Sequence, residues 1–331
     1  MPTQPKLQKA VMTAVRDYLC LTQDETFLVV TDEQMREIGY ALYEAGTTIA
    51  SEAFIIEMHS RDLNGEEPPD QIASMMRKVD VVVCPTYRSL THTEARRIAS
   101  DLGVRVATMP SITLDILSRC LSADPNKIIE TTKSVAEKMK KVQKIRIISK
   151  LGTDITLYVK NRRVISSTGV LRNIGDYGNL PSGEVYLAPT EGKANGVIVF
   201  DGSIAGIGLL KDPVTIEVKD GYAKAISGKE EADKLTTMLN KVGTDAFAIG
   251  EFGIGTNYKA KLSGNILEDE KVLGTIHIAF GNNIGMGGKI AVKLHVDGLV
   301  KKPTVYFDNY LIMDNGKLVD VDHDIDEDTS V

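Results

Sequence analysis

The sequence predicts a two-domain protein: an N-terminal parallel α/β domain followed by a mainly antiparallel, barrel-like β domain. Three observations lead to this fold class. The chain has 331 residues, more than a single hydrophobic core usually reaches. Its first third alternates short apolar runs with amphipathic helical segments, the pattern of a parallel sheet covered by helices. From residue 144 onward, strand patterns follow one another with Gly or Asn at the turns.

Composition restricts the partners and the compartment. The net charge of −6 argues against nucleic acid as the main partner, because phosphate binding needs concentrated Lys and Arg. No apolar run approaches the roughly 18 residues that a membrane helix needs. Cys20, Cys84 and Cys120 cannot all pair with one another, and the N-terminus lacks a secretory pattern. We therefore expect a cytoplasmic protein without a membrane span.

The α/β domain is expected to cover residues 1–122. Strand patterns alternate with helical patterns that have short connections, so the strands should be parallel. The expected strands are 26–30, 52–58, 79–86 and 104–110, and the expected helices are 6–20, 31–50, 65–79 and 91–103. The turn after the first strand, VVTDEQ, contains no glycine-rich phosphate loop. We therefore expect a docking or dimerising domain and not a nucleotide site.

A helix at 123–143 should link this domain to the β domain at 144–320, which is followed by an acidic tail at 321–331. In the β domain, residues 144–169 predict two antiparallel strands joined at Leu-Gly-Thr-Asp. The further strand patterns lie at 184–189, 196–204, 214–226, 246–255, 274–281, 291–300 and 304–313. Only residues 229–243 predict a clear helix in this part of the chain.

The stretch 273–308 contains three candidate metal ligands. His277, His295 and Asp297 all lie in alternating apolar and polar runs, which is a strand pattern. Residues two apart on a strand point to the same face, so His295 and Asp297 should present an imidazole and a carboxylate side by side. With His277 on a neighbouring strand, the β domain is expected to carry a metal site.

Two carboxylates elsewhere in the β domain extend this set. Glu184 and Glu251 each stand among small and apolar residues, where a charge must be paired or bound to a metal. Three carboxylates and two imidazoles are the ligand chemistry of a site for two divalent ions. The acidic run 268–270 is expected to be a solvated loop, with a general base as the alternative.

The segments NLPSGEVYLAP, GEFGIGTN, HIAFGNN and LHVDG, in this order, resemble the aminopeptidase T-like metallopeptidases. The resemblance implies a homodimeric aminopeptidase-like hydrolase that cleaves N-terminal residues of small peptides through a metal-activated water. The implied metal ligands are Glu184, Glu251, His277, His295 and Asp297, of which Glu184 and Glu251 are also expected to be catalytic. The implied cofactors are two Zn²⁺ or Co²⁺ ions, with Mn²⁺ as a further candidate. Ile284 departs from the family, whose members carry a tyrosine there.

Two alternatives remain open at this point. The resemblance extends to a dihydroxypyridine ring-cleaving dioxygenase of the same fold, with a small-molecule substrate. It would use one Fe(II), held at the positions of His277, His295 and Asp297, and two imidazoles with one carboxylate suit Fe(II). The other alternative is a non-catalytic dimer that the metal stabilises.

Overall fold

The computed structural model describes residues 4–319, which fall into two compact units. Unit 1 comprises Met1–Thr132, Ser166–Val185 and Gly255–Leu273, and unit 2 comprises Lys133–Ile165, Tyr186–Ile254 and Gly274–Val331. The units therefore interleave along the chain, whereas the domains expected from the sequence were contiguous. The acidic tail expected at 321–331 lies outside the described residues.

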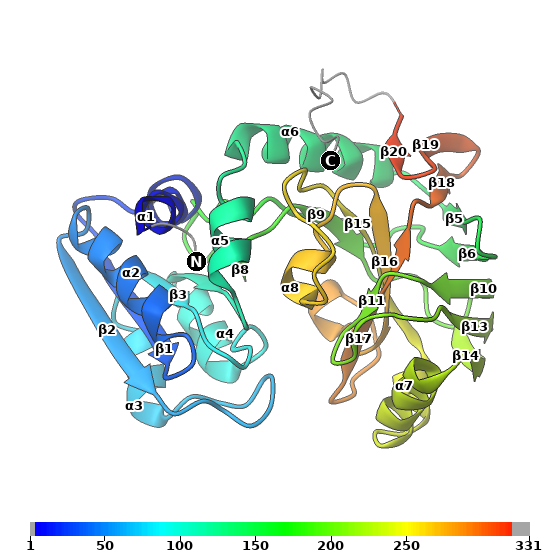
Figure 1. The fold of residues 1–331 in the computed structure, drawn as a ribbon, viewed down its shortest axis with the longest axis horizontal. Helices are drawn as coiled ribbons and strands as arrows, with labels where there is room; N and C mark the ends of the chain where they lie inside the picture. The colour runs from blue at the N-terminus through cyan, green and yellow to red at the C-terminus, as the bar shows by residue number, and fades with distance from the viewer. Residues whose placement is uncertain (1–3, 320–331) are drawn as a thin grey trace. The chain divides into compact units, whose positions relative to one another are not determined.

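Unit 1 contains a five-stranded parallel sheet with the strand order β2-β1-β3-β4-β8 (Figure 1). Its strands are β1 Thr26–Asp32, β2 Glu52–Met58, β3 Val81–Cys84, β4 Arg105–Thr108 and β8 Tyr177–Asn179. Its helices are α1 Gln4–Thr13, η1 Ala14–Tyr18, α2 Arg36–Thr47, α3 Asp70–Met76, α4 Glu94–Asp101, α5 Leu114–Cys120 and α8 Ile266–Asp269. This part of the fold class is confirmed.

The two faces of this sheet are covered by different helices, as the alternation along β1 requires. Phe27 and Val29 belong to a core cluster that includes residues of α1, α2 and α5. Leu28 and Val30 belong to a second cluster, built with residues of α3 and α4. All four side chains are fully buried, which explains why residues 27–30 of β1 are continuously apolar.

Unit 2 and the β strands that lead into it form two largely antiparallel sheets. One has eight strands in the order β14-β13-β10-β6-β5-β18-β19-β20, and the other has seven in the order β12-β11-β17-β16-β15-β9-β7. The first contains β5 Lys144–Ile148, β6 Asp154–Tyr158, β10 Asn195–Phe200, β13 Val214–Lys219, β14 Tyr222–Ser227, β18 Thr304–Phe307, β19 Tyr310–Asp314 and β20 Lys317–Leu318. The second contains β7 Ile165–Ser167, β9 Glu184–Leu187, β11 Ser203–Ile204, β12 Gly208–Leu209, β15 Ile249–Gly255, β16 Thr275–Gly281 and β17 His295–Lys301.

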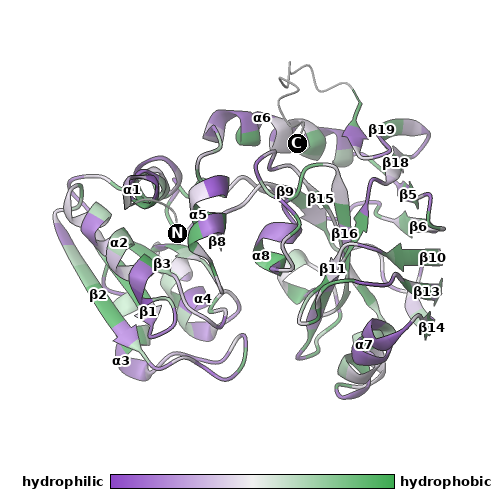
Figure 2. Ribbon diagram, in the orientation of Figure 1, coloured by the Kyte–Doolittle hydropathy of each residue, from purple (hydrophilic) through white to green (hydrophobic). Residues whose placement is uncertain are grey.

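Few helices accompany these sheets. They are α7 Glu230–Asn240, η2 Thr244–Phe247 and η3 Ile284–Met286, while α6 Pro125–Met139 spans the boundary between the units. In Figure 2, α7 is coloured mainly hydrophilic, as expected for a helix that buries only one stripe of residues. The mainly antiparallel second part of the fold class is therefore confirmed, with its strands arranged in two sheets.

The sequence did not predict α5 and β8, which are both short. β8 pairs in parallel with β4, although it follows the first antiparallel strands in the chain. Within the described residues, no helix is long and apolar enough to cross a membrane.

Candidate metal centre

One face of three neighbouring strands carries four of the predicted ligands. In the antiparallel register, Glu251 of β15 pairs with Ala279 of β16, and Ala279 pairs with Asp297 of β17. His295 lies two residues before Asp297 and therefore shares its face. The small side chain of Ala279 therefore stands between the two carboxylates in the register.

Glu251, His295 and Asp297 bring their ligand atoms within 4.8 Å of one another. The Nε2 atom of His295 lies 3.2 Å from Oε2 of Glu251 and 3.4 Å from Oδ1 of Asp297. Both carboxylates are buried, whereas 27% of the His295 side chain is exposed. The site is thus dry on the carboxylate side and open at His295.

The ring of His295 is held by the backbone of the following loop. Its Nδ1–H donates to the carbonyl oxygen of Asn282 at 2.8 Å, because a carbonyl can only accept. The Asn282 backbone is itself fixed, since its N–H donates to the carbonyl of Leu294 at 2.7 Å and its Nδ2 donates to the carbonyl of Val292 at 3.0 Å. Such a bond to one ring nitrogen leaves the other, Nε2, available to a metal.

His277 lies beside this group and contacts Glu251. Its Nε2 is 3.2 Å from Oε1 of Glu251, so the imidazole donates to the carboxylate. The ring lies over Gly253, its register partner on β15, where an added Cβ would come within 2.0 Å of Nε2. A glycine at this point allows the close approach of a side chain to the strand.

The charges in the group stabilise one another. Burial disfavours the charged form of Glu251, but hydrogen bonds from His277 and His295 outweigh this and hold the pKa of Glu251 well below its usual range. Burial also opposes the charged form of His295, but Asp297 and Glu251 raise the pKa of His295 well above its usual value.

The residues fit a divalent metal ion. Oδ1 of Asp297 is buried and receives no hydrogen bond within the described part of the chain, apart from its ion-pair distance to His295. An orphaned buried carboxylate oxygen is costly unless a cation binds it. One imidazole nitrogen and two carboxylates are N and O donors that suit first-row divalent ions such as Fe(II), Mn(II) and Zn(II).

Glu184 has a different neighbour. It belongs to unit 1, where its Oε1 accepts a hydrogen bond from Nζ of Lys271 at 2.8 Å. Lys271 is fully buried and also pairs with Glu270. Lys271 was not among the predicted site residues, because the run Glu268-Asp269-Glu270-Lys271 has the composition of a solvated surface loop.

That expectation of a solvated loop is wrong. Glu268 and Asp269 are fully buried in α8, because each side chain has specific donors. Glu268 pairs with Arg119 and accepts from the Lys261 N–H, while Asp269 accepts from the N–H groups of Ser263 and Gly264. Ile284, at the position of the family tyrosine, begins η3 and is half exposed.

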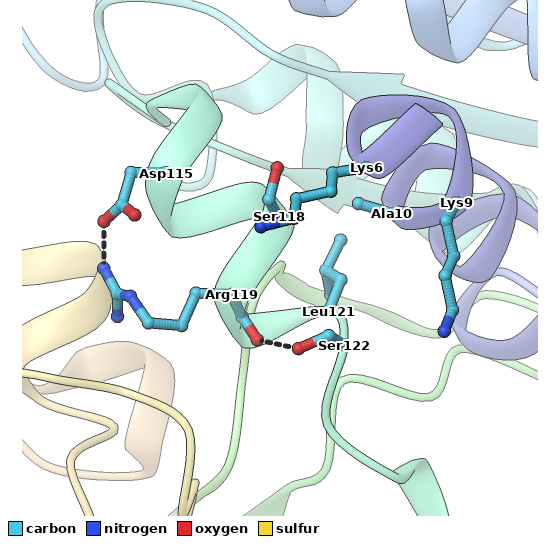
Figure 3. Close-up of a pocket in the computed structure, with 8 residues that line it drawn as sticks. All are labelled: Lys6, Lys9, Ala10, Asp115, Ser118, Arg119, Leu121 and Ser122. Atoms are coloured by element: carbon cyan, nitrogen blue, oxygen red, sulfur yellow. Dashed lines mark hydrogen bonds and ion pairs between the residues drawn. The ribbon is translucent and has the colours of Figure 1, made fainter. Parts of the chain in front are cut away.

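A pocket of about 680 Å³ lies between α1 and the α5 region of unit 1 (Figure 3). It is lined by Lys6, Lys9, Ala10, Asp115, Ser118, Arg119, Leu121 and Ser122. None of these is a predicted ligand, and the Arg119 guanidinium is already paired with Asp115 and Glu268. This pocket is therefore not the site that the sequence predicts.

Comparisons with known proteins identify similar chains. The model of the NicX family, described as 2,5-dihydroxypyridine 5,6-dioxygenase, matches residues 11–320. The curated 2,5-dihydroxypyridine 5,6-dioxygenase of Pseudomonas putida KT2440 is 22% identical over 220 residues. This alignment spans 62% of the present chain and 62% of that relative.

Two solved structures share the fold. The 2,5-dihydroxypyridine dioxygenase from Pseudomonas putida KT2440 has a TM-score of 0.85 at 16% identity, with 97% of this chain and 99% of that chain covered. AmpT from Thermus thermophilus has a TM-score of 0.72 at 14% identity, with 96% and 99% covered. At these identities the structural similarity establishes the arrangement of the chain and not its chemistry.

Proposed function

Because the chain belongs to the 2,5-dihydroxypyridine 5,6-dioxygenase family, we propose that it is a ring-cleaving dioxygenase for a dihydroxypyridine or a closely related hydroxylated ring. The match over residues 11–320 is the observation that carries this proposal, since it includes all five predicted ligands. The convergence of Glu251, His295 and Asp297 supports it, because a metal-dependent oxygenase needs such a donor group.

The expectation of a metal-dependent aminopeptidase is wrong. The family model and the curated relative both describe a dioxygenase, so hydrolysis, peptidase activity and proteolysis do not describe this chain. The non-catalytic dimer is set aside for the same reason. The segments that suggested a peptidase reflect a shared fold, as the similarity to AmpT shows.

In the proposed site, Glu251, His295 and Asp297 would hold one Fe(II). When bound, the iron would supply open positions at which dioxygen and a hydroxylated ring are brought together and activated. Two carboxylates would balance the charge of the ion. The partial exposure of His295 supports entry of the substrate from that side, while the buried carboxylates exclude water from the other.

The remaining residues position these ligands. Asn282 fixes the tautomer and the orientation of His295 through its carbonyl oxygen. His277 donates to Glu251 and so orients the carboxylate. Its direct ligation of the metal, expected from the sequence, stays a prediction. The homodimer and the cytoplasmic location expected from the sequence stay predictions.

Metal reconstitution tests the proposal. Metal-free protein would be loaded without oxygen with Fe(II), Mn(II) or Zn(II), and then given 2,5-dihydroxypyridine and air while the absorbance of the aromatic ring is followed. We expect that only Fe(II) restores activity, seen as a decrease in the absorbance of the aromatic ring. Asp297→Asn should remain inactive with every metal. The proposal would be contradicted if the ring absorbance decreased as fast with Zn(II), or without oxygen, as it does with Fe(II) in air.

A further inference from the structure

The loop between β16 and β17, residues 282–294 of unit 2, holds the proposed metal ligand His295 through one peptide group. At one end of this group, the carbonyl of Asn282 accepts a hydrogen bond from Nδ1 of His295 at 2.8 Å. At the other end, the N–H of Asn283 donates to the carbonyl of Ile290 at 3.1 Å. Because the peptide is planar, rotation of the group would break both bonds. The orientation of the His295 ring therefore depends on how firmly Asn283 is held.

The composition of this loop gives it little rigidity of its own. Residues 284–288 are Ile-Gly-Met-Gly-Gly, and glycine loses more conformational freedom on folding than any other residue. A Cβ added at Gly285 or Gly287 would have no atom within 4 Å, so these positions are not held by packing. The shape of the loop must therefore come from the hydrogen bonds at its base.

Asn283 makes most of these hydrogen bonds, and its side chain is fully buried. Its Oδ1 accepts from the N–H of Ile290 at 2.8 Å. Its carbonyl oxygen accepts from the N–H groups of Met286 and Gly288 at 3.1 and 3.0 Å. Its Nδ2 donates to Oε1 of Glu191 at 3.1 Å, and this bond connects the loop to a distant part of the chain.

A single oxygen atom of Glu191 accepts three hydrogen bonds. Its Oε1 is 3.1 Å from Nδ2 of Asn283 and 2.9 Å from the backbone N of Lys289, both in the loop. The third donor is Nη2 of Arg162 at 3.0 Å, and Arg162 is itself held by the bond from its Nε to the carbonyl of Ala188 at 2.6 Å. Glu191 thus fastens the loop to two other segments of unit 2.

The Glu191 side chain is ionised at neutral pH. Burial acts to raise the pKa of Glu191, but its own backbone N–H, the N–H of Lys289 and the Arg162 guanidinium outweigh this and lower the pKa below its usual value. An ionised acceptor makes stronger hydrogen bonds than a neutral one.

We propose that Glu191 is a positioning residue of the metal centre, which acts through the loop on His295. It binds the loop at Asn283 and Lys289, and the carbonyl of Asn282 then stays directed at Nδ1 of His295. The Nε2 atom of His295 consequently faces the other ligands. The inference rests on the proposed function, because the ring that Glu191 positions belongs to the proposed iron site.

Hydrogen exchange in the metal-free protein tests this inference. The solvent exchange of the His295 Nδ1–H would be measured by NMR with ¹⁵N-labelled histidine, and His295→Ala would assign the signal. We expect Glu191→Ala to exchange about 10-fold faster than wild type, because the loop opens more often once its acceptor is removed. Glu191→Gln should exchange at the wild-type rate, since glutamine keeps an oxygen at the Oε1 position.

Asp154→Ala is the matched control. Asp154 lies on β6 of the same unit and pairs with Arg146 through two hydrogen bonds of 3.0 and 2.9 Å, but it does not bind the loop. We expect the wild-type exchange rate in this variant. Equally fast exchange in Asp154→Ala and Glu191→Ala would show a general loss of stability and overturn the inference.

Glu191→Asp decides the question if Glu191→Ala does not fold. It keeps the charge but withdraws the oxygen by one methylene group, so exchange should again be faster than in wild type. The wild-type rate in a folded Glu191→Ala, or in Glu191→Asp where the alanine variant does not fold, would overturn the inference.

Anaerobic titration with Fe(II) gives a second measurement. We expect the affinity of Glu191→Ala to be about 10-fold lower than that of wild type, as for other residues that position ligands, and that of Glu191→Gln to be unchanged. Equal affinity in Glu191→Ala and wild type would overturn the inference. A wild type that bound no iron would instead contradict the proposed function, since the exchange rate is measured without metal.

Discussion

The Nδ1 of His295 lies 2.8 Å from the carbonyl oxygen of Asn282, and this hydrogen bond determines which ring nitrogen faces Glu251 and Asp297. Nδ1 must carry the proton, so Nε2 retains the lone pair that a metal needs once the ring is neutral. The loop that holds Asn282 is thus a part of the metal centre, although it contributes no ligand.

His295→Ala tests the metal centre. The substitution removes one donor of three, and we expect the Fe(II) affinity to fall by more than about 100-fold, measured by anaerobic titration. His59→Ala is the matched control, because His59 is an exposed histidine of unit 1. If His295→Ala bound one iron per chain with the wild-type affinity, His295 would not be a metal ligand.

Gly253→Ala tests the role of His277. The new methyl group would come within 2.0 Å of the His277 Nε2 atom, so the imidazole must move away from Glu251. We expect a loss of about 1–3 kcal/mol in the free energy of unfolding, as for other overpacked sites. The Fe(II) affinity should fall by about 10-fold, as for other residues that position ligands.

Gly285→Ala serves as the control for this substitution. An added Cβ at Gly285 has no atom within 4 Å, so the stability should change by less than about 0.5 kcal/mol. Chemical denaturation of both variants checks the pair. If Gly253→Ala were as stable as Gly285→Ala and bound iron equally well, the close packing of His277 on β15 would contribute neither to stability nor to iron binding.

The Glu25–Arg105 ion pair should make the stability of unit 1 depend on pH. Glu25 binds Arg105 through two hydrogen bonds of 2.6 and 2.9 Å, and Arg105 holds the pKa of Glu25 below its usual value. Because the pKa of Glu25 is lower in the folded than in the unfolded protein, the ion pair stabilises the fold at pH values above the ordinary glutamate pKa of about 4.3. This contribution is lost as the pH falls through the folded-state pKa.

We therefore expect Glu25→Gln to cost about 1–3 kcal/mol near neutral pH, where a charge-assisted pair is lost. Below the folded-state pKa of Glu25 the variant and the wild type should converge. Urea denaturation at several pH values measures the difference, with the exposed Glu37→Gln on α2 as the control. A difference that is the same at every pH would refute the role of the Glu25 charge.

Much of the fold could be predicted from the sequence because local patterns determine it. β1 and β3 contain continuous apolar runs, and strands such as β5 and β13 alternate apolar and polar residues, so their positions were found. β8 and α5 were missed because they are only three and seven residues long, so that each contains fewer than two periods of its pattern.

The site was predictable only in part. His295 and Asp297 share a strand face, so their proximity follows from their spacing alone. The position of Glu251 depends on strand pairing and on the register shift between Ile249 and Glu251, which local sequence does not encode. Lys271 was missed because a buried lysine depends on the distant Glu184, 87 positions away.

The measurement that tests the central claim most directly is the fate of labelled oxygen. Iron-loaded protein would convert 2,5-dihydroxypyridine under ¹⁸O₂ in ordinary water, and the product would be analysed by mass spectrometry. A ring-cleaving dioxygenase places both atoms of dioxygen in the ring-opened product. Product formed without label from dioxygen, or with oxygen taken only from water, would show hydrolytic chemistry and contradict the account.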